Sequence, residues 1–333
     1  MSDAPSDSPG LHITGEERWN QREFDNWLIQ MRDLAANWTE ADLQHYTTIG
    51  GLQGILDSGR LWGTHVAFVN DSQELDYGVG EICNMVEAFS GEWAWEAEQP
   101  DSKDSDHQKF VSELIKSVHE FITNNREILK PNLGPFVSCL STSQDQLSQW
   151  RGYGQSGYAI RFDPKLLGSS IEHVDADGNI TKGPKPALVK VEYMPSAFYE
   201  QVTKMVTTHV ADFAETMSIG DEREQDETQN TVNFNLLRKL MEIAPQLKHH
   251  KFAEEQEYRI ITQGKEDIYT PTKLGLVPRV LIEFDPSAIK EIMVGPGEFS
   301  DLRKLSIERY IQKNARRYGG LEVTTSEVPY REL

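Results

Sequence analysis

The chain of 333 residues contains only two cysteines, Cys83 and Cys139. Two thiols cannot build a disulfide framework or a cysteine-based zinc site, so we expect two buried free thiols in a reducing compartment. No hydrophobic run approaches the roughly 18 residues that a membrane-spanning helix needs. The opening residues, MSDAPSDSPG, lack the basic and apolar regions of a signal peptide. These absences predict a cytoplasmic protein.

Basic residues are also scarce, with 33 Lys and Arg against 53 Asp and Glu, which gives a net charge of −20. An acidic surface repels phosphate backbones and anionic membranes, which argues against a general nucleic-acid binder or a membrane partner. A local basic site for one small anionic ligand stays compatible with this charge. The one compact basic cluster is Lys248-His249-His250-Lys251. Its adjacent histidines lack metal-ligand spacing, so no metal is expected.

Composition and periodicity together predict the organisation of the chain. Residues 1–16 are a polar tail, and residues 17–40 have the apolar spacing of an amphipathic helix. Residues 41–333 are expected to form a single domain with helical insertions at about 73–130 and 197–247.

Within that domain, short β-prone runs alternate irregularly with helical segments. A helix is expected from about residue 73 to 89 and another over 108–130, stopped by Pro131. Residues 91–107 and the acidic run 221–227 are expected to be loops. The order of elements lacks the regular alternation of a doubly wound fold and predicts an α+β protein with a split sheet. The expected strands cover residues 43–48, 60–69, 135–142, 157–164, 187–194, 257–263, 278–284, 289–295 and 320–328.

Two early segments carry candidate binding residues. Alternation in a strand sends His45 and Thr47 to one face and Tyr46 to the other, so the His and the Thr can hold ribose hydroxyls together. A structural histidine at a sheet edge is an equally acceptable interpretation. Asn70 and Asp71 precede a helix, where they either cap its backbone N–H groups or face a phosphate or ribose at its positive end.

A third segment combines aromatic, glycine and arginine residues. Trp150, Tyr153 and Tyr158 supply stacking faces, and Arg151 supplies a planar donor fork for phosphate or carboxylate. The glycines among them allow close backbone approach, which suits a flat ring with a charged tail. The segment is not a dinucleotide-binding fingerprint, because no apolar strand precedes it in the right frame. A packed turn with core aromatics is the alternative.

The fourth segment carries two carboxylates. Glu255, Glu257 and Arg259 share one face of a strand if that strand begins by Glu255. Two carboxylates on one face are costly to bury unless a ligand uses them or a cation pairs with them. The alternative to a functional site is therefore a salt-bridged strand.

These segments, with several further motifs, resemble a widespread bacterial family of uncharacterised proteins over about residues 43–331. Asn70-Asp71-Ser72 departs from the family, which often has Pro after Asp. The matching motifs are His45-Tyr46, Ile55-Leu56-Asp57-Ser58-Gly59-Arg60-Leu61-Trp62, Asn70-Asp71 with Glu74, Cys139-Leu140-Ser141, Trp150 with Tyr153, Gly157-Tyr158-Ala159-Ile160-Arg161-Phe162, Glu255-Gln256-Glu257-Tyr258-Arg259, and Ser326-Glu327-Val328-Pro329-Tyr330-Arg331.

The opening part is also similar to ADP-ribosyltransferases of the DNA-modifying toxin type (DarT). This resemblance implies a split-sheet ADP-ribosyltransferase fold and NAD as substrate, with His45 holding a ribose. It implies that Tyr158 or Tyr153 stacks on nicotinamide. Glu257 would stabilise the oxocarbenium-like transition state, and Glu255 would orient or deprotonate the acceptor. Tyr46, Thr47, Asn70, Asp71, Trp150, Arg151 and Arg259 complete the expected NAD-binding set.

The leading hypothesis is therefore an NAD-dependent ADP-ribosyltransferase or NAD glycohydrolase, in a toxin or anti-phage role. Its acceptor, a protein or a nucleic acid, and any regulatory partner are not visible in the sequence. One alternative is a nucleotide-binding sensor without catalysis. Another is a nucleic-acid-processing defence effector, which the charge of −20 disfavours.

Overall fold

The computed structural model describes residues 40–69, 73–99, 105–154, 157–217 and 219–329. The expected tail, the expected N-terminal helix up to residue 39, and both Asn70 and Asp71 lie outside this set. The described residues form helices and an 11-stranded, mostly antiparallel sheet, which confirms the α+β prediction. None of the described helices is long and apolar enough to cross a membrane.

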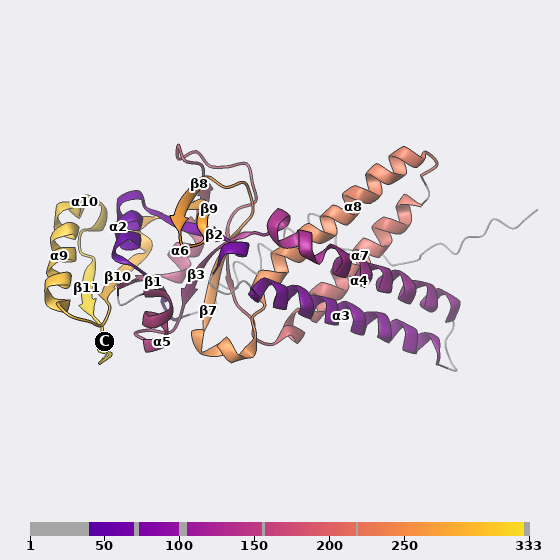
Figure 1. Ribbon diagram of the computed structural model, residues 1–333, viewed down its shortest axis with the longest axis horizontal. Helices are drawn as coiled ribbons and strands as arrows, with labels where there is room; N and C mark the ends of the chain where they lie inside the picture. Colours follow the sequence, from indigo (N-terminus) through magenta and orange to yellow (C-terminus); the bar gives the residue numbers. More distant parts are fainter. Residues whose placement is uncertain (1–39, 70–72, 100–104, 155–156, 218, 330–333) are drawn as a thin grey trace, which may run out of the picture. The chain divides into compact units, whose positions relative to one another are not determined.

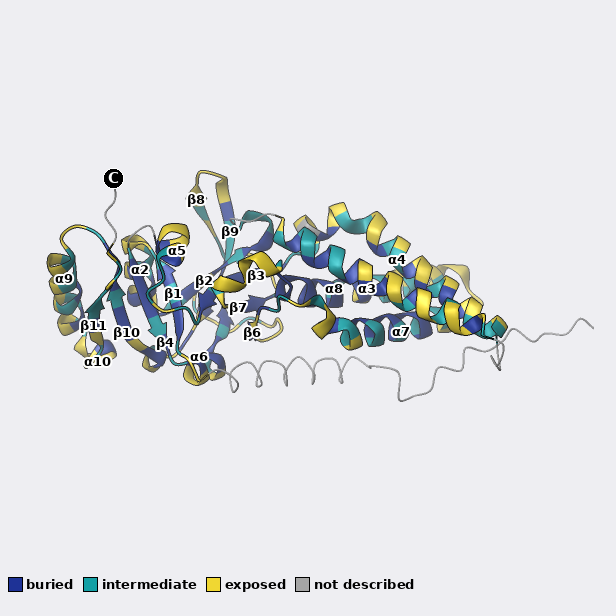
Figure 2. Ribbon diagram, turned by 90° about the horizontal axis from the view of Figure 1, so that it is seen from below, coloured by how far each residue is buried: buried dark blue, intermediate teal, exposed yellow. Residues whose placement is uncertain are grey.

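The chain divides into a helical unit, residues 73–134 and 194–247, and a sheet unit, residues 135–193 and 248 onward together with the strands before residue 73. The helical unit packs its long helices side by side (Figure 1). Their apolar residues recur at helical spacing, and these buried faces meet inside the bundle (Figure 2). The helices are α3 (Glu74–Ala97), α4 (Ser105–Leu133), α7 (Tyr199–Thr216) and α8 (Glu222–Ile243), with 3-10 turns η3 (Pro195–Phe198) and η4 (Ala244–Gln246).

Three expectations for this unit were wrong. The loop predicted over 91–107 is helical at both ends, because its charged residues lie on solvent-facing positions of α3 and α4. Helix α4 passes through Pro131, whose ring removes one backbone hydrogen bond, and ends two residues later at Leu133. The acidic run 221–227 is helical from residue 222, because Asp221 caps α8 by accepting from the Glu224 N–H (2.9 Å). Acidic residues are favourable at this positive helix end.

The sheet unit is built on strands in the order β11-β10-β4-β1-β3-β2-β9-β5, with β7 pairing β3 and β6, and β8 pairing β9. All nine predicted strand segments contain a strand, whereas β5 and β8 were not predicted. The strands are β1 (Leu43–Thr47), β2 (Arg60–His65), β3 (Phe136–Ser141), β4 (Tyr158–Phe162), β5 (Glu172–Val174), β6 (Ala187–Lys190), β7 (Glu257–Thr262), β8 (Ile268–Thr272), β9 (Gly275–Glu283), β10 (Ile289–Val294) and β11 (Glu322–Thr325).

Helices cover one face of this sheet and bury its main core. Leu52 and Ile55 of α2, Leu167 of α6, and Ile307 and Ile311 of α9 pack in one cluster with the apolar strand residues of that face. Helix α2 ends at Gly59, whose positive φ of 72° closes the helix with a left-handed cap. The elements are α2 (Ile49–Ser58), α5 (Leu147–Gln149), α6 (Pro164–Ser170), α9 (Ser300–Lys313), α10 (Ala315–Tyr318), the π-helical turn η2 (Trp150–Gly154), and the 3-10 turns η1 (Val66–Phe68), η5 (His250–Glu255) and η6 (Pro286–Ala288).

The sheet opens along one edge of β3. The other edge pairs with β7 along the whole strand, Phe136 to Ser141. On the open edge, β1 pairs only at Gln44 with Ser141, and β2 pairs only at Thr64 and His65. The strands β1 and β2 therefore diverge and leave the middle of β3 without a strand partner on that side. The ring Nδ1 of His45 lies 2.9 Å from the Cys139 carbonyl oxygen in this gap.

Candidate functional site

Strand register assigns the predicted site residues to two opposite faces of the sheet. Residues paired across antiparallel strands share a face. Thr47 pairs with Tyr158, so His45, Thr47 and Tyr158 lie on the face covered by the helices. Gln44 pairs with Ser141, which pairs with Glu257, so these three lie on the other face. The structure therefore does not bring His45 and Glu257 together on one surface.

A network of four charged side chains lies on the Glu257 face. Lys248 Nζ donates to Glu255 Oε2 at 2.6 Å and to Glu257 Oε2 at 2.8 Å. Arg259 donates through Nε to Glu257 Oε1 at 2.7 Å and through one terminal nitrogen to Oε2 at 2.9 Å. Two cations thus neutralise two anions, which is the condition for burying ionised groups without a large penalty.

Burial separates the two carboxylates of this network. The Lys248 side chain is 1% exposed, and those of Glu257 and Arg259 are equally enclosed, whereas Glu255 is 16% exposed. Burial by itself raises the pKa of Glu257, but the charges and hydrogen bonds of Arg259 and Lys248 outweigh it and hold the pKa at about 2. Glu257 is therefore a permanent anion with both oxygens engaged, and Glu255 is the carboxylate nearer to solvent.

The backbone places Glu255 differently from the sequence prediction. Strand β7 begins at Glu257, and Glu255 ends the preceding turn η5. Gln256 between them has a positive φ of 44°, a left-handed conformation that turns the chain. The two carboxylates meet because of this turn and because Lys248 bridges them, and not because of strand alternation.

Two tyrosines border the network. The Tyr153 hydroxyl donates to the Glu255 carboxylate (3.3 and 3.4 Å), and Tyr153 is 38% exposed at the end of the π-helical turn. The Tyr193 hydroxyl accepts the Glu257 backbone N–H at 3.0 Å. Burial raises the pKa of both phenols, that of Tyr193 to about 12, so both stay neutral hydrogen-bonding groups at physiological pH. Irregular π-turns are frequent at functional sites.

The other predicted aromatics are core residues. Trp150 is fully enclosed, stacks edge-on against Tyr46 with 4.8 Å between ring centroids, and donates from its indole to Asp145 at 2.8 Å. Tyr158 is buried in the main core. Of the three aromatics in the segment 150–158, Trp150 and Tyr158 are therefore packed core residues, and Tyr153 is the exposed one. Arg151 is exposed.

His45 is bound into the open edge of β3 by its contact with the Cys139 carbonyl. Burial lowers its pKa more than this hydrogen bond raises it, so the ring is neutral at physiological pH. This contact matches the structural alternative for His45. Among the described residues, no group of three or more His, Cys, Asp or Glu side chains is arranged to hold a metal ion.

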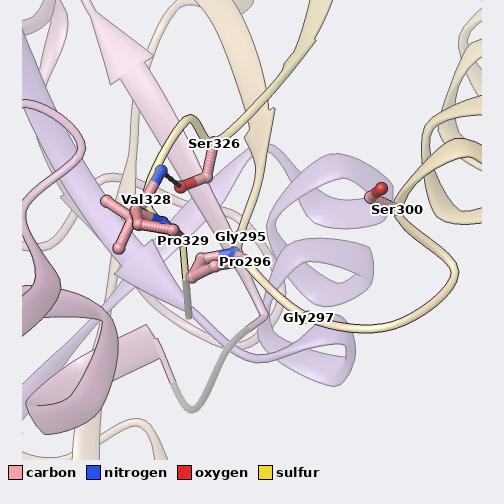
Figure 3. Close-up of a pocket in the computed structure, with 7 residues that line it drawn as sticks. All are labelled: Gly295, Pro296, Gly297, Ser300, Ser326, Val328 and Pro329. Carbon is pink, nitrogen blue, oxygen red and sulfur yellow. Dashed lines mark hydrogen bonds between the residues drawn. The ribbon is translucent and has the colours of Figure 1, made fainter. Parts of the chain in front are cut away.

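A separate pocket of about 580 Å³ lies where β10 leads into α9 (Figure 3). Gly295, Pro296, Gly297 and Ser300 line the pocket from the β10–α9 connection, and Ser326, Val328 and Pro329 line it from the segment after β11. An added Cβ at Gly295 would lie 2.8 Å from the Trp150 ring, so only glycine fits there. None of the residues that line the pocket belongs to the charged network, although Ser326, Val328 and Pro329 belong to a motif of the resembling family.

Sequence reasoning also missed Lys248, Tyr193 and Gln44. Lys248 was noted only as part of a basic cluster, although its distances to Glu255 and Glu257 make it the centre of the network. A lysine a few residues before a paired E-x-E motif could have suggested this role. Tyr193 and Gln44 lie far away in sequence, and only the strand pairings reveal them.

Comparisons with known proteins reach only part of this site. Residues 149–260, about a third of the chain, match the model of a family described as a protein of unknown function (DUF2971). This is consistent with the resemblance to an uncharacterised bacterial family. The segment includes Tyr153, Tyr193, Lys248 and the pair Glu255 and Glu257. No curated protein and no solved structure shows significant similarity to the chain.

Proposed function

We propose that this protein cleaves the bond between nicotinamide and ribose in NAD, as an ADP-ribosyltransferase or an NAD glycohydrolase. The observation that carries the proposal is a solvent-facing carboxylate, Glu255, fixed by a buried lysine beside a half-exposed tyrosine. The open edge of β3 is compatible with the split sheet of ADP-ribosyltransferases. A toxin or anti-phage role is part of the same proposal and rests on the resemblance alone.

The chemistry requires a fixed negative charge next to the ribose. Breaking the glycosidic bond to nicotinamide builds positive charge on the ribose, and a preorganised carboxylate offsets that charge where it develops. Glu255 meets this need because Lys248 and Tyr153 fix its orientation while part of it stays exposed. The ring of Tyr153 is available to stack on the nicotinamide.

This assignment reverses the roles that the resemblance implies for the two glutamates. Both oxygens of Glu257 already accept hydrogen bonds from Arg259 and Lys248, so we assign it a positioning role. Glu257 holds Lys248, and Lys248 in turn holds Glu255. His45 and Tyr158 receive no ligand contact in this proposal, because both lie on the other face of the sheet.

The test is nicotinamide release from NAD, separated by chromatography, in three variants. Glu255→Gln should lower kcat by roughly 100- to 1,000-fold, the usual effect of removing one transition-state contact. Glu254→Gln is the matched control, because that side chain is exposed and the hydrogen bond of this residue to Ser143 uses its backbone carbonyl. Tyr153→Leu should raise KM more than it lowers kcat. Equal rates in Glu255→Gln and the unaltered protein would contradict the proposal.

A nucleotide-binding protein without catalysis is the second candidate. The charge balance of the network favours it, because two cations and two anions need no substrate to stabilise them. Calorimetry distinguishes the candidates: tight NAD binding with no nicotinamide released, with or without an added protein or DNA acceptor, would favour binding alone.

A further inference from the structure

A row of polar side chains crosses the face of the sheet that carries Glu257. The register pairs Glu291 of β10 with Arg161 of β4, Arg161 with Gln44 of β1, Gln44 with Ser141 of β3, and Ser141 with Glu257 of β7. Neighbouring strands lie about 4.8 Å apart, so Gln44 is roughly 10 Å from Glu257 along this row. Gln44 is buried in this row, with 1% of its surface exposed.

Two adjacent members of this row have unused hydrogen-bond donors. The side-chain amide Nε2 of Gln44 is buried and has no partner among the described residues. The Nε of Arg161 also has no hydrogen bond there, although it forms a longer ion pair with Asp42 Oδ2 at 3.6 Å. Buried donors are almost always paired in folded proteins, and an unpaired one is destabilising. Two such donors on paired residues are available to an oxygen acceptor that the described residues do not supply.

Charge restricts the kind of acceptor. Arg161 is already ion-paired with Glu291 and Asp42, and Lys290 Nζ also pairs with Asp42 at 2.7 Å. The local charges cancel, and a phosphate would meet two carboxylates. A neutral oxygen, such as the carbonyl of a carboxamide, satisfies the donors without this repulsion.

We infer that Gln44 donates a hydrogen bond to the carboxamide oxygen of the nicotinamide group, an inference that rests on the function proposed above. The reactive ribose lies beside Glu255 and Glu257, and nicotinamide is the part of NAD attached directly to that ribose. Gln44 is thus a specificity residue that distinguishes NAD from ADP-ribose. Gln44 and Tyr46 are the residues of β1 on this face, and Tyr46 packs against Trp150, whereas His45 between them lies on the opposite face.

The test is the variant Gln44→Met, which keeps the length of the side chain and removes the donor. By calorimetry, the Kd for NAD should rise about tenfold, the value of one good hydrogen bond, and the Kd for ADP-ribose should not change. The ligand-free variant should unfold roughly 2–4 °C higher, because an unsatisfied buried donor has been removed. Gln246→Met is the matched control: Gln246 is equally buried, but its Nε2 donates to the Glu242 carbonyl at 2.9 Å, so its loss should lower the unfolding midpoint.

The outcomes separate this inference from the proposed function. If the unaltered protein turns over NAD while Gln44→Met binds it equally well, the inference is wrong and the function stands. If Gln44→Met lowers the unfolding midpoint as Gln246→Met does, the donor is already used within the protein and the inference is again wrong. If the unaltered protein neither binds nor cleaves NAD, both are overturned.

Discussion

Replacing Glu257 with glutamine should destabilise the sheet unit by an amount that depends on pH. The side chain is buried with Lys248 and Arg259, and its pKa is held at about 2 against an ordinary 4.5. A difference of this size corresponds to roughly 3 kcal/mol of folding free energy at pH 7. Glutamine keeps the shape of the side chain, but it removes the anion with which both Lys248 and Arg259 pair.

The sign of the pH dependence follows from the direction of the shift. Because the folded-state pKa lies below the unfolded value, the contribution of Glu257 is complete above about pH 4.5 and is lost as the pH falls toward 2. The unaltered protein and Glu257→Gln should therefore differ most at pH 7, by roughly half as much at pH 3, and converge only near pH 2.

The measurement is urea unfolding of both proteins at pH 7, 5 and 3. Glu254→Gln is the control, since that exposed side chain should change stability by less than about 0.5 kcal/mol. Equal stability of Glu257→Gln and the unaltered protein at pH 7 would refute the reasoning, as would a difference that is the same at all three pH values.

Two further predictions concern the helical unit. Burial lowers the pKa of His209 to about 4, so the ring is neutral in the folded protein. The free energy of unfolding should therefore decline by roughly 3 kcal/mol as the pH falls from 6.5 to 4. In thermal unfolding, His209→Gln should reduce this decline, and an unchanged pH profile would contradict the prediction. Gly78→Ala should cost about 2 kcal/mol or more, because the added Cβ would lie 2.2 Å from the Ala244 carbonyl oxygen. The Cβ added by Gly80→Ala would lie 3.5 Å from the end of the Arg126 side chain, so this substitution should stabilise α3 by up to about 1 kcal/mol. Equal effects of Gly78→Ala and Gly80→Ala on urea unfolding would contradict this prediction.

Local sequence patterns predicted the elements well where the pattern itself determines the structure. The segments around Ala159 and Ile260 have alternating or continuous apolar residues, and each is a strand in the structure. The acidic run after Asp221 is a helix and not the expected loop, because Asp221 caps α8 and acidic side chains are favourable in its first turn.

The site was harder to predict, because it depends on pairings between distant segments. The sequence identified Glu255, Glu257 and Arg259, which lie close together in the chain. It could not reveal that Ser141 and Gln44 align with Glu257, since one residue of register shift would exchange the two faces of a strand. For the same reason, His45 was expected near the carboxylates and lies on the opposite face.

The position of Lys248 has a consequence for how the chain folds. Residues 194–247 leave the sheet unit after Tyr193 and return at Lys248, and the Lys248 N–H donates to the Glu192 carbonyl at 3.1 Å. Helices α7 and α8 pack against each other within this excursion. Early formation of that helical pair would bring its two ends together and shorten the effective loop that must close before β6 pairs with β7. We therefore expect substitutions that weaken α7–α8 packing to slow the assembly of the sheet, although they lie outside it.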